Sequence, residues 1–209
     1  SQFKEIIKEV LDGLHYVLKT KNDVLVFASS GTGAMESSIS NILSPGDKVL
    51  VVRGGKFGER FYEIAESYGA EPIAVDCEWG TPVNPQEIET ALKKTPDIKA
   101  VYTTLCETST AVINDIKTIG EIVSKTRAVL VVDVISGLGA VEFETDEWKV
   151  DIAVGGSQKG LMIPPGIAFV SVSQKAWKLV ESAKMPRYYF CYKAAKKSAD
   201  KIDTPWTPA

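Results

Sequence analysis

The chain has 209 residues, 44% of them hydrophobic and 24% charged, which is the composition of one folded domain with a single core. Its formal net charge of −3 provides neither the basic field that nucleic-acid binding needs nor a polybasic patch for a membrane surface. No apolar run approaches the roughly 20 residues that span a bilayer, and the amphipathic N-terminus differs from a signal peptide.

Helical and strand-like segments alternate along the chain, as the spacing of its apolar residues indicates. The sequence predicts helices at residues 2–20, 31–43, 57–68, 85–94 and 114–125, and a long C-terminal helix from Ser173 onward. It predicts strands at residues 24–28, 48–52, 72–77, 98–104, 128–133, 151–154 and 167–172. Strands that alternate with helices form a mostly parallel sheet covered by helices, and ligands bind beyond the carboxyl ends of its strands.

Histidine and cysteine are too scarce for several common kinds of active site. His15 is the single histidine, and its place among leucines of the first helix favours a packing or surface role. Hydrolases with a histidine base and histidine-rich metal sites are therefore disfavoured. Cys77, Cys106 and Cys191 are widely spaced without a CxxC pair, which predicts neither disulfides nor a zinc site and favours a reducing cytoplasm.

The stretch 151–169 places Lys159 on a tight loop after a predicted strand. Small residues at 155–157 precede the lysine, Gln158 lies beside it, and a Pro-Pro-Gly run at 164–166 stops regular structure. A lysine is ordinarily a solvated surface charge, but this context indicates a backbone shaped for close approach. The amine of a reactive lysine forms a Schiff base with a carbonyl, and the cofactor that uses this reaction is pyridoxal phosphate (PLP).

PLP also requires a phosphate cradle and an acidic partner for its ring nitrogen, and the sequence offers a candidate for each. Residues 29–33, Ser-Ser-Gly-Thr-Gly, lie between a strand and a helix, where backbone N–H groups and the helix dipole attract an anion. The alternative for this segment is a simple tight connection. Asp133 ends a buried strand 26 positions before Lys159, and a protonated pyridine nitrogen is a natural partner for it. The alternative is a carboxylate satisfied by the turn at 136–137.

Four segments together resemble the class V aminotransferases. Residues 156–159 read Gly-Ser-Gln-Lys, with Gly166 following, and this pattern is similar to the lysine signature of that family. The phosphate-loop candidate, the Gly-Lys-Phe-Gly-Glu-Arg segment at 55–60 and the Cys-Glu-Thr-Ser-Thr-Ala segment at 106–111 occur in the family's order. Within class V the chain most resembles serine–pyruvate and alanine–glyoxylate aminotransferases, together with proteins labelled as small subunits of a soluble hydrogenase.

The resemblance implies a role for individual residues. Lys159 would hold PLP as a Schiff base and move the substrate proton, and Asp133 would keep the pyridine nitrogen protonated. Phe57 would lie against the cofactor ring, although an ordinary core phenylalanine is the alternative. A hydroxyl at Thr108 would bind the phenolic oxygen or the nearby ring, and the preceding Leu-Cys pair means that no ring-stacking histidine is expected. The cofactor-binding residues that it implies are Ser30, Gly31, Thr32, Gly33, Phe57, Thr108, Asp133, Ile135, Gln158, Lys159, Thr204 and Thr207.

The resemblance also implies the large domain of a fold type I PLP enzyme. This domain is a three-layer α/β/α sandwich around a mainly parallel seven-stranded sheet with one antiparallel strand. Residues 1–209 are expected to be this single domain, with the family's N-terminal segment and small C-terminal domain, which carries the substrate-binding arginine, outside the chain. The family works as a homodimer whose sites lie at the subunit interface, and Thr204 and Thr207 resemble residues that reach the partner's phosphate.

The expected activity is PLP-dependent transfer of an amino group from serine, alanine or aspartate to glyoxylate or pyruvate. Two alternatives stay open. A class V lyase or cysteine desulfurase would need a mobile nucleophilic cysteine, and Cys191 lies in a helical context. A nonenzymatic doubly wound module in a complex, such as a hydrogenase-associated subunit, would use its lysine only at an interface.

Overall fold

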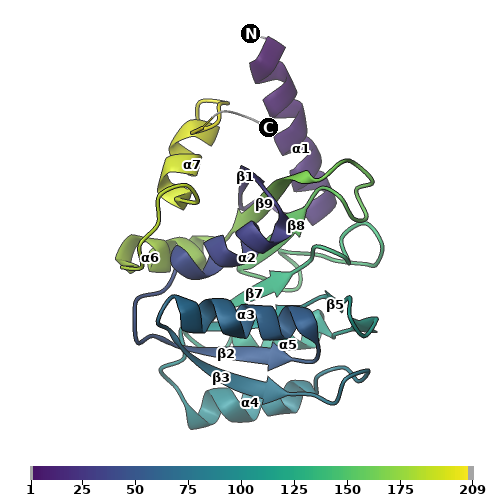
Figure 1. The fold of residues 1–209 in the computed structure, drawn as a ribbon, viewed down its shortest axis with the longest axis vertical. Coiled ribbons are helices and arrows are strands. Elements are labelled where there is room, and N and C mark those ends of the chain that lie inside the picture. The colour runs from purple at the N-terminus through teal and green to yellow at the C-terminus, as the bar shows by residue number, and fades with distance from the viewer. Residues whose placement is uncertain (1, 207–209) are drawn as a thin grey trace.

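The computed structural model describes residues 2–206 and shows helices and strands in alternation (Figure 1). The helices are α1 (Gln2–Leu18), α2 (Gly31–Ser40), α3 (Lys56–Ser67), α4 (Pro85–Lys94), α5 (Ile116–Val123), α6 (Gln174–Ser182) and α7 (Tyr192–Ala199). The strands are β1 (Asp23–Ser29), β2 (Lys48–Arg53), β3 (Glu71–Asp76), β4 (Ala100–Thr104), β5 (Cys106–Glu107), β6 (Val112–Ile113), β7 (Val129–Asp133), β8 (Ile152–Gly156) and β9 (Gly166–Val172).

Seven strands form one sheet in the order β1-β9-β8-β7-β4-β2-β3, and β5 pairs with β6 in a separate hairpin. Strand β9 is antiparallel to both of its neighbours, β1 and β8, while the pairs from β8 to β3 are parallel. The predicted mainly parallel sheet with one reversed strand is therefore confirmed. The register pairs Thr104 with Asp133, so the carboxyl ends of β4 and β7 lie side by side.

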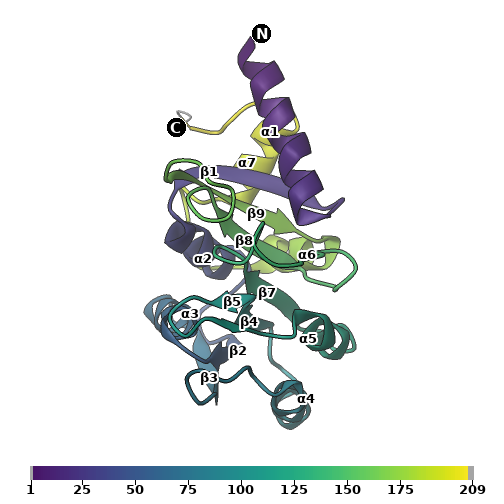
Figure 2. The same ribbon diagram turned by 90° about the vertical axis from the view of Figure 1, so that its right-hand side faces the viewer.

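Helices cover both faces of the sheet and form a three-layer sandwich. Buried side chains of α2, α3, α6 and α7 pack on one face, and those of α1, α4 and α5 pack on the other. Figure 2 shows α2 and α3 on one side of the sheet and α4 and α5 on the other. Because both faces are covered, β4 and β7 are buried throughout, which explains their continuous apolar sequence.

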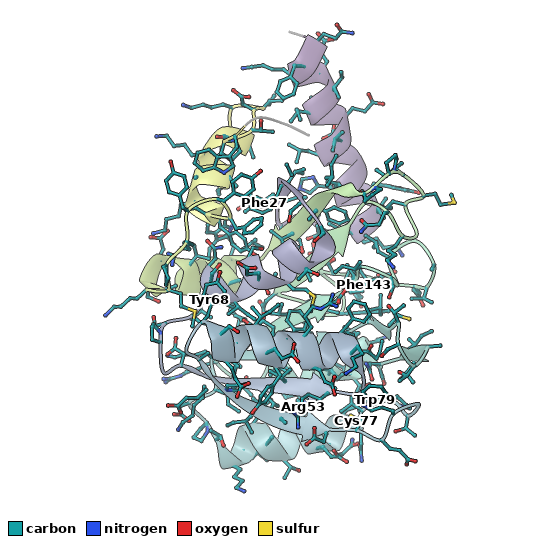
Figure 3. The ribbon with its side chains drawn as sticks, viewed as in Figure 1. Phe27, Arg53, Tyr68, Cys77, Trp79 and Phe143 are labelled. Carbon is teal, nitrogen blue, oxygen red and sulfur yellow. The ribbon has the colours of Figure 1, made fainter. Side chains whose placement is uncertain are left out.

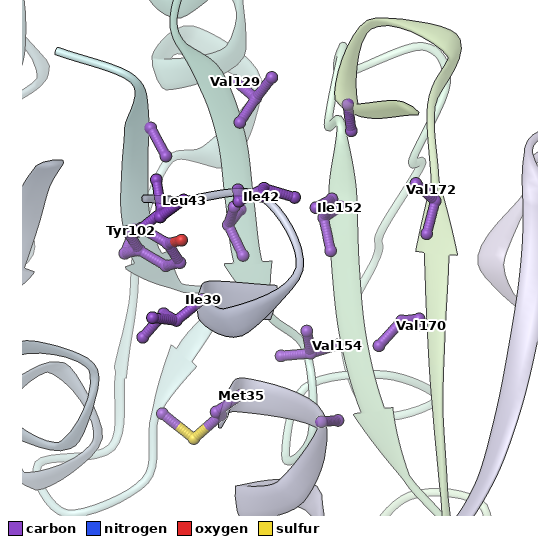
Figure 4. Close-up of a cluster of buried hydrophobic side chains, with 14 of the residues drawn as sticks. Met35, Ile39, Ile42, Leu43, Tyr102, Val129, Ile152, Val154, Val170 and Val172 are labelled. Atoms are coloured by element: carbon purple, nitrogen blue, oxygen red, sulfur yellow. The ribbon is translucent and has the colours of Figure 1, made fainter. Parts of the chain in front are cut away.

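Helix α2 packs on the sheet within the core that it shares with α3, α6 and α7. Figure 4 shows its Met35 and Ile39 over the strands, close to side chains such as Val154 of β8. Both α2 side chains are fully buried, and dense packing of this kind allows little movement of a helix. The sheet thus fixes the direction in which the N-terminus of α2 points.

The N-terminal region joins this core through aromatic and polar contacts. Phe27, labelled in Figure 3, lies between β1 and α7, where its ring stacks on Tyr192 with centroids 6.1 Å apart. The two ring nitrogens of His15 lie 2.7 Å from the carbonyl oxygen of Leu11 and 3.0 Å from that of Asn22. His15 therefore connects the end of α1 to the turn before β1, in agreement with the predicted packing role.

Two features differ from the predicted elements. The long helix expected from Ser173 onward is two helices, because α6 ends at Ala183 in an extended conformation and Pro186 follows. Arg187 stabilises this break by donating to the carbonyl oxygens of Ala183, at 3.2 Å, and Met185, at 3.0 Å. The β5–β6 hairpin was not predicted, since two-residue strands are too short to show an alternating pattern.

Candidate active site

Lys159 lies on the loop that joins β8 to β9. The hydroxyl of Ser157 donates to the carbonyl oxygen of Pro164 at 2.7 Å and closes this loop. Gly160 packs directly on the turn after β7, because a Cβ there would lie 2.1 Å from the carbonyl oxygen of Leu138. The loop backbone is therefore fixed against the neighbouring strand end, while the Lys159 side chain remains exposed.

Asp133 is a buried carboxylate at the end of β7. Its side chain is 4% exposed, and Oδ1 accepts the N–H of Ile135 at 2.7 Å. No other described residue donates a hydrogen bond to the carboxylate, so Oδ2 is left without a partner within residues 2–206. Burial raises the pKa of Asp133 to about 7, against the Ile135 hydrogen bond; the charge of Glu107 raises the pKa further, and those of Arg60 and Lys159 lower it.

The N-terminus of α2 presents unused donors beside this carboxylate. Ser30 is the N-cap residue, but its hydroxyl makes no capping hydrogen bond. The N–H groups of Gly31 and Thr32 bond to no other described residue, and no acidic side chain lies in the first turn. Gly31 is required for packing, since a Cβ there would lie 2.4 Å from Cδ1 of Ile135. The helix end is therefore able to bind an anion.

Gln158 supplies an unpaired amide next to the same helix end. Its Oε1 atom is buried and has no hydrogen-bond partner among the described residues. A Cβ built on Gly156 would lie 3.4 Å from this oxygen and 3.6 Å from the backbone nitrogen of Gly31, so the two segments approach closely. A buried polar atom without a partner is costly, which indicates that a bound group completes its hydrogen bonding.

Helix α3 brings an aromatic ring and a cation to the site. Phe57 is half-buried and lines the cavity, which distinguishes it from the ordinary core phenylalanine that was the alternative. The guanidinium carbon of Arg60 lies 4.8 Å from the centre of the Phe57 ring, and Nη1 donates to Oγ1 of Thr32 at 3.1 Å. Arg60 thus joins α3 to the first turn of α2, a role that the sequence pattern did not predict.

Two hydroxyl groups join the β5–β6 hairpin to the end of β7. Oγ1 of Thr108 donates to Oγ of Ser136 at 2.7 Å, and that hydroxyl donates to the carbonyl oxygen of Cys106 at 3.1 Å. Ser136 was predicted only as part of a turn, and its side-chain contacts are visible only once the hairpin is folded. The Thr108 hydroxyl is thereby held beside Asp133 and Ile135, which line the same cavity.

Nine of the twelve predicted cofactor-binding residues meet at one cavity of about 210 Å³. Its lining consists of Ser30, Gly31, Thr32, Phe57, Arg60, Thr108, Asp133, Ile135, Ser136, Gln158 and Lys159. Gly33 instead faces Ser29 and Phe190, and Thr204 lies in a separate apolar groove with its hydroxyl bonded to the carbonyl oxygen of Trp206 at 2.8 Å. Thr207 lies outside the described residues.

The donor set of the cavity fits PLP. The amine of Lys159 is available for the carbonyl of PLP, and the unpaired oxygen of Asp133 for its ring nitrogen. Phe57 can pack on a face of the PLP ring, and the N-terminus of α2 can bind the phosphate. Within residues 2–206, no group of histidine, cysteine and acidic side chains is placed to hold a metal ion. The same part of the chain contains no helix that combines the length and the apolar character needed to cross a membrane.

Two curated proteins are similar to this chain over nearly its whole length. The small subunit of the soluble hydrogenase of a Synechococcus species is 44% identical over 99% of this chain and 55% of its own length. The L-aspartate–glyoxylate aminotransferase of Paracoccus denitrificans is 40% identical over 99% of this chain and 53% of its own length. The chain thus spans about half the length of the curated relatives that it matches.

A solved structure agrees with the sequence similarity. The aspartate aminotransferase of subgroup IV from Thermus thermophilus superposes with a TM-score of 0.91 at 30% identity, over 100% of this chain and 58% of the other. The family model for class-V aminotransferases matches residues 1–199, which is most of the chain. This family consists of PLP-dependent enzymes. The chain belongs to the class-V aminotransferase family.

Proposed function

We propose that the cavity around Lys159 binds PLP in a single cofactor-binding domain of an aminotransferase. The amino donor in this proposal is serine, alanine or aspartate, and the acceptor is glyoxylate or pyruvate. One observation carries the proposal. The exposed Lys159 and the buried Asp133, which has one hydrogen bond, line the same cavity as the uncapped N-terminus of α2. The aspartate–glyoxylate aminotransferase among the relatives supports the substrate class.

Lys159 and Asp133 are the two proposed catalytic residues. Bound PLP supplies a carbonyl for covalent attachment and a ring that accepts the electrons of the substrate's Cα–H bond. The amine of Lys159 would hold the cofactor by its carbonyl and would move the proton from the substrate Cα. Asp133 holds a proton on the ring nitrogen through its unpaired oxygen, and this contact favours its ionised form.

The remaining residues of the cavity bind and orient. The hydroxyl of Ser30, the N–H groups of Gly31 and Thr32, and the Nε2 amide group of Gln158 would donate to the phosphate at the positive end of α2. Gly33 belongs to the same turn, and its part in phosphate binding stays a prediction. Phe57 covers one face of the ring, and Ile135 lies in the cavity wall. Thr108, whose hydroxyl is oriented by Ser136, is placed for the phenolic oxygen.

Covalent labelling of Lys159 tests the proposal directly. Protein reconstituted with PLP should absorb visible light, and borohydride reduction followed by peptide mass spectrometry should place a phosphopyridoxyl group on Lys159. In Lys159→Ala both signals should be lost, while the far-ultraviolet circular dichroism stays the same because an exposed loop lysine adds little packing. Labelling at a different lysine, or none in the parent protein, would contradict the assignment.

The two alternatives receive less support from the described residues. Cys191, the residue that a desulfurase would use, is the N-cap of α7 and does not line the cavity. The relative named as a hydrogenase subunit keeps a nonenzymatic role in view. The visible absorbance discriminates between these functions, because a structural module has no reason to bind PLP covalently.

A homodimer and a cytoplasmic location complete the proposal. Met162 and Ile163, beside Lys159, are 89% and 50% exposed, and an apolar loop next to a site favours contact with a second chain. Thr204 would then act on the partner's phosphate, which accounts for its distance from the cavity of its own chain. Sedimentation equilibrium should give twice the mass of the chain.

The proposed cytoplasmic location is consistent with the free thiols of Cys77, Cys106 and Cys191, the state that a reducing compartment maintains.

A further inference from the structure

Glu107 is a buried carboxylate that does not line the cavity. It lies in β5, its side chain is 1% exposed, and its neighbour in sequence, Thr108, does line the cavity. Burying a carboxylate is costly unless donors replace the lost water. A glutamate in this position is therefore expected to have specific partners, and these partners belong to the helix that carries Phe57.

The carboxylate of Glu107 binds the first turn of α3. It accepts the N–H of Phe57 at 3.2 Å and the N–H of Gly58 at 3.0 Å. It also accepts the hydroxyl of Ser109 at 2.6 Å, and that hydroxyl in turn accepts the N–H of Lys56 at 2.9 Å. The first three N–H groups of α3 are thus satisfied by side chains of the hairpin, some 50 residues later in the chain.

Gly55 makes room for this contact. It occupies the N-cap position of α3, where a side chain of its own would normally supply the cap, and it has none. A Cβ on Gly55 would lie 2.4 Å from Oγ of Ser109 and 2.6 Å from Cγ of Glu107. Its φ of 167° is extended backbone, so the requirement for glycine is one of space and not of conformation.

The capped turn is the part of α3 that enters the site. Phe57 and Arg60 both line the cavity, and Arg60 reaches Thr32 at the phosphate loop candidate. The hairpin that carries Glu107 is itself bonded to the end of β7 through Ser136, three residues after Asp133. Hydrogen bonds on both sides of the hairpin therefore connect the turn after β7 to the helix that carries the aromatic ring.

We propose that Glu107 is a positioning residue for the cofactor: it fixes the first turn of α3, and so holds Phe57 and Arg60 against a ring bound by Asp133. It acts through the backbone of α3 and touches neither cofactor nor substrate. The inference rests on the proposed function, because the ring and phosphate that it orients are those of PLP.

The test is Glu107→Gln in the purified protein, with Asp115→Ala as the matched control. Glutamine keeps the size of the side chain but loses the charge and turns an NH₂ group toward N–H donors. Asp115 is the N-cap of α5, accepts the N–H of Thr118 at 3.0 Å, and lies outside the cavity. Its loss also removes a helix cap, so it separates general destabilisation from positioning.

Glu107→Gln should weaken PLP binding by about 10- to 100-fold, the range found for side chains that orient metal ligands without touching the metal. The visible circular dichroism of bound PLP should also change, since it reports the asymmetric surroundings of the ring. In the cofactor-free protein, hydrogen exchange at the amides of Phe57 and Gly58 should speed up. Asp115→Ala should lower the midpoint of unfolding but leave the PLP dissociation constant and the dichroism unchanged.

Gly55→Ala provides a second variant in case Glu107→Gln folds poorly. It keeps the carboxylate and displaces it by steric contact alone, so it should weaken PLP binding in the same direction. Unchanged PLP affinity in both variants, with a parent protein that is yellow, would overturn the inference and leave the proposed function intact. A parent protein that binds no PLP would overturn the proposed function. The exchange measurement needs no cofactor, and unchanged exchange at the two amides would overturn the inference in either case.

Discussion

Asp133 is a buried carboxylate with too few hydrogen-bond donors in the cofactor-free protein. Its position at the end of a buried strand removes water from the carboxylate, and only Ile135 donates to it among the described residues. The pKa near 7 follows from that burial. A ring N–H⁺ would provide the missing partner, and the ionised form would then be the stable one.

We expect Asp133→Asn to retain PLP but to lose most of its turnover. Asparagine preserves the shape of the side chain and still forms a hydrogen bond, but it does not stabilise a protonated ring nitrogen. A fall of about 10² to 10⁴ in kcat is the range for a group that stabilises charge or moves a proton. Steady-state transamination by the PLP-saturated protein measures it. Turnover close to that of the parent would identify Asp133 as a turn-capping carboxylate.

The raised pKa of Asp133 also makes the free energy of unfolding of the cofactor-free protein depend on pH. Its folded pKa, about 7, is raised above the ordinary value of 3.8, so its contribution to stability is complete below pH 4 and is lost as the pH rises to about 7. The loss amounts to at most about 4 kcal/mol. Urea unfolding between pH 4 and pH 8 should show this decline in the parent and a flatter profile in Asp133→Asn. Equal slopes in the two proteins would contradict the raised pKa.

Several residues of the site were predictable from sequence because their signal is local. Lys159 follows small residues at a strand end, and Asp133 ends an apolar run, so each carries its context within a few positions. Arg60, Ser136 and Glu107 had no assigned role, since their partners are 28 or more positions away along the chain. A residue whose role depends on a hydrogen-bond partner far away in the sequence leaves no periodic trace.

Two helices of this fold use their N-cap serines in different ways. Ser173 of α6 accepts the N–H of Ala176 at 3.1 Å and donates to Asp151 at 2.6 Å. Ser30 of α2 makes no capping hydrogen bond, although its helix is the longer of the two. The difference indicates that the cap of α6 serves stability and the hydroxyl of α2 is available to a ligand.

Paired serine substitutions test this division between the helices. Ser173→Ala should lower the free energy of unfolding of the cofactor-free protein by about 1 kcal/mol, the usual cost of a lost cap. Ser30→Ala should leave that energy nearly unchanged and weaken PLP binding instead. Urea denaturation and fluorescence titration with PLP measure the two effects. A destabilisation by Ser30→Ala as large as that by Ser173→Ala would mean that Ser30 is a structural cap.

The main elements of the fold were predictable, and the exceptions have a common cause. The spacing of apolar residues, and the glycines and prolines at the ends of segments, predicted the strands of the large sheet and the helices between them. The break between α6 and α7 depends on Pro186 and on carbonyl groups that Arg187 satisfies, among them that of Ser40, which lies 147 positions earlier. The β5–β6 hairpin depends on pairing between Cys106 and Ile113. In both cases tertiary contacts, and not local periodicity, determine the structure.

At the scale of the molecule, PLP binding should stabilise the whole fold. The cavity is formed by residues of α2, α3, β7 and the β8–β9 loop, so a ligand there contacts elements from both halves of the sheet. At a PLP concentration 100 times its dissociation constant, linkage predicts a gain of about 2.7 kcal/mol. Thermal unfolding of the parent should shift upward with PLP, and that of Lys159→Ala should shift much less. Equal shifts would show that attachment to Lys159 contributes little to binding.

The reversed strand β9 also has a consequence for the order of folding. It pairs Asp23 with Val172 on one side and Ile152 with Val172 on the other, so β1 joins the sheet only through a strand made about 150 residues later. On a ribosome, β1 emerges early and has no sheet neighbour until β9 is synthesised. Contacts this far apart in sequence form slowly, because closing a long loop costs entropy before the pairing compensates for it. We therefore expect β1 to stay unpaired for longer during synthesis than the strands of the parallel part of the sheet, whose partners lie much nearer in the sequence.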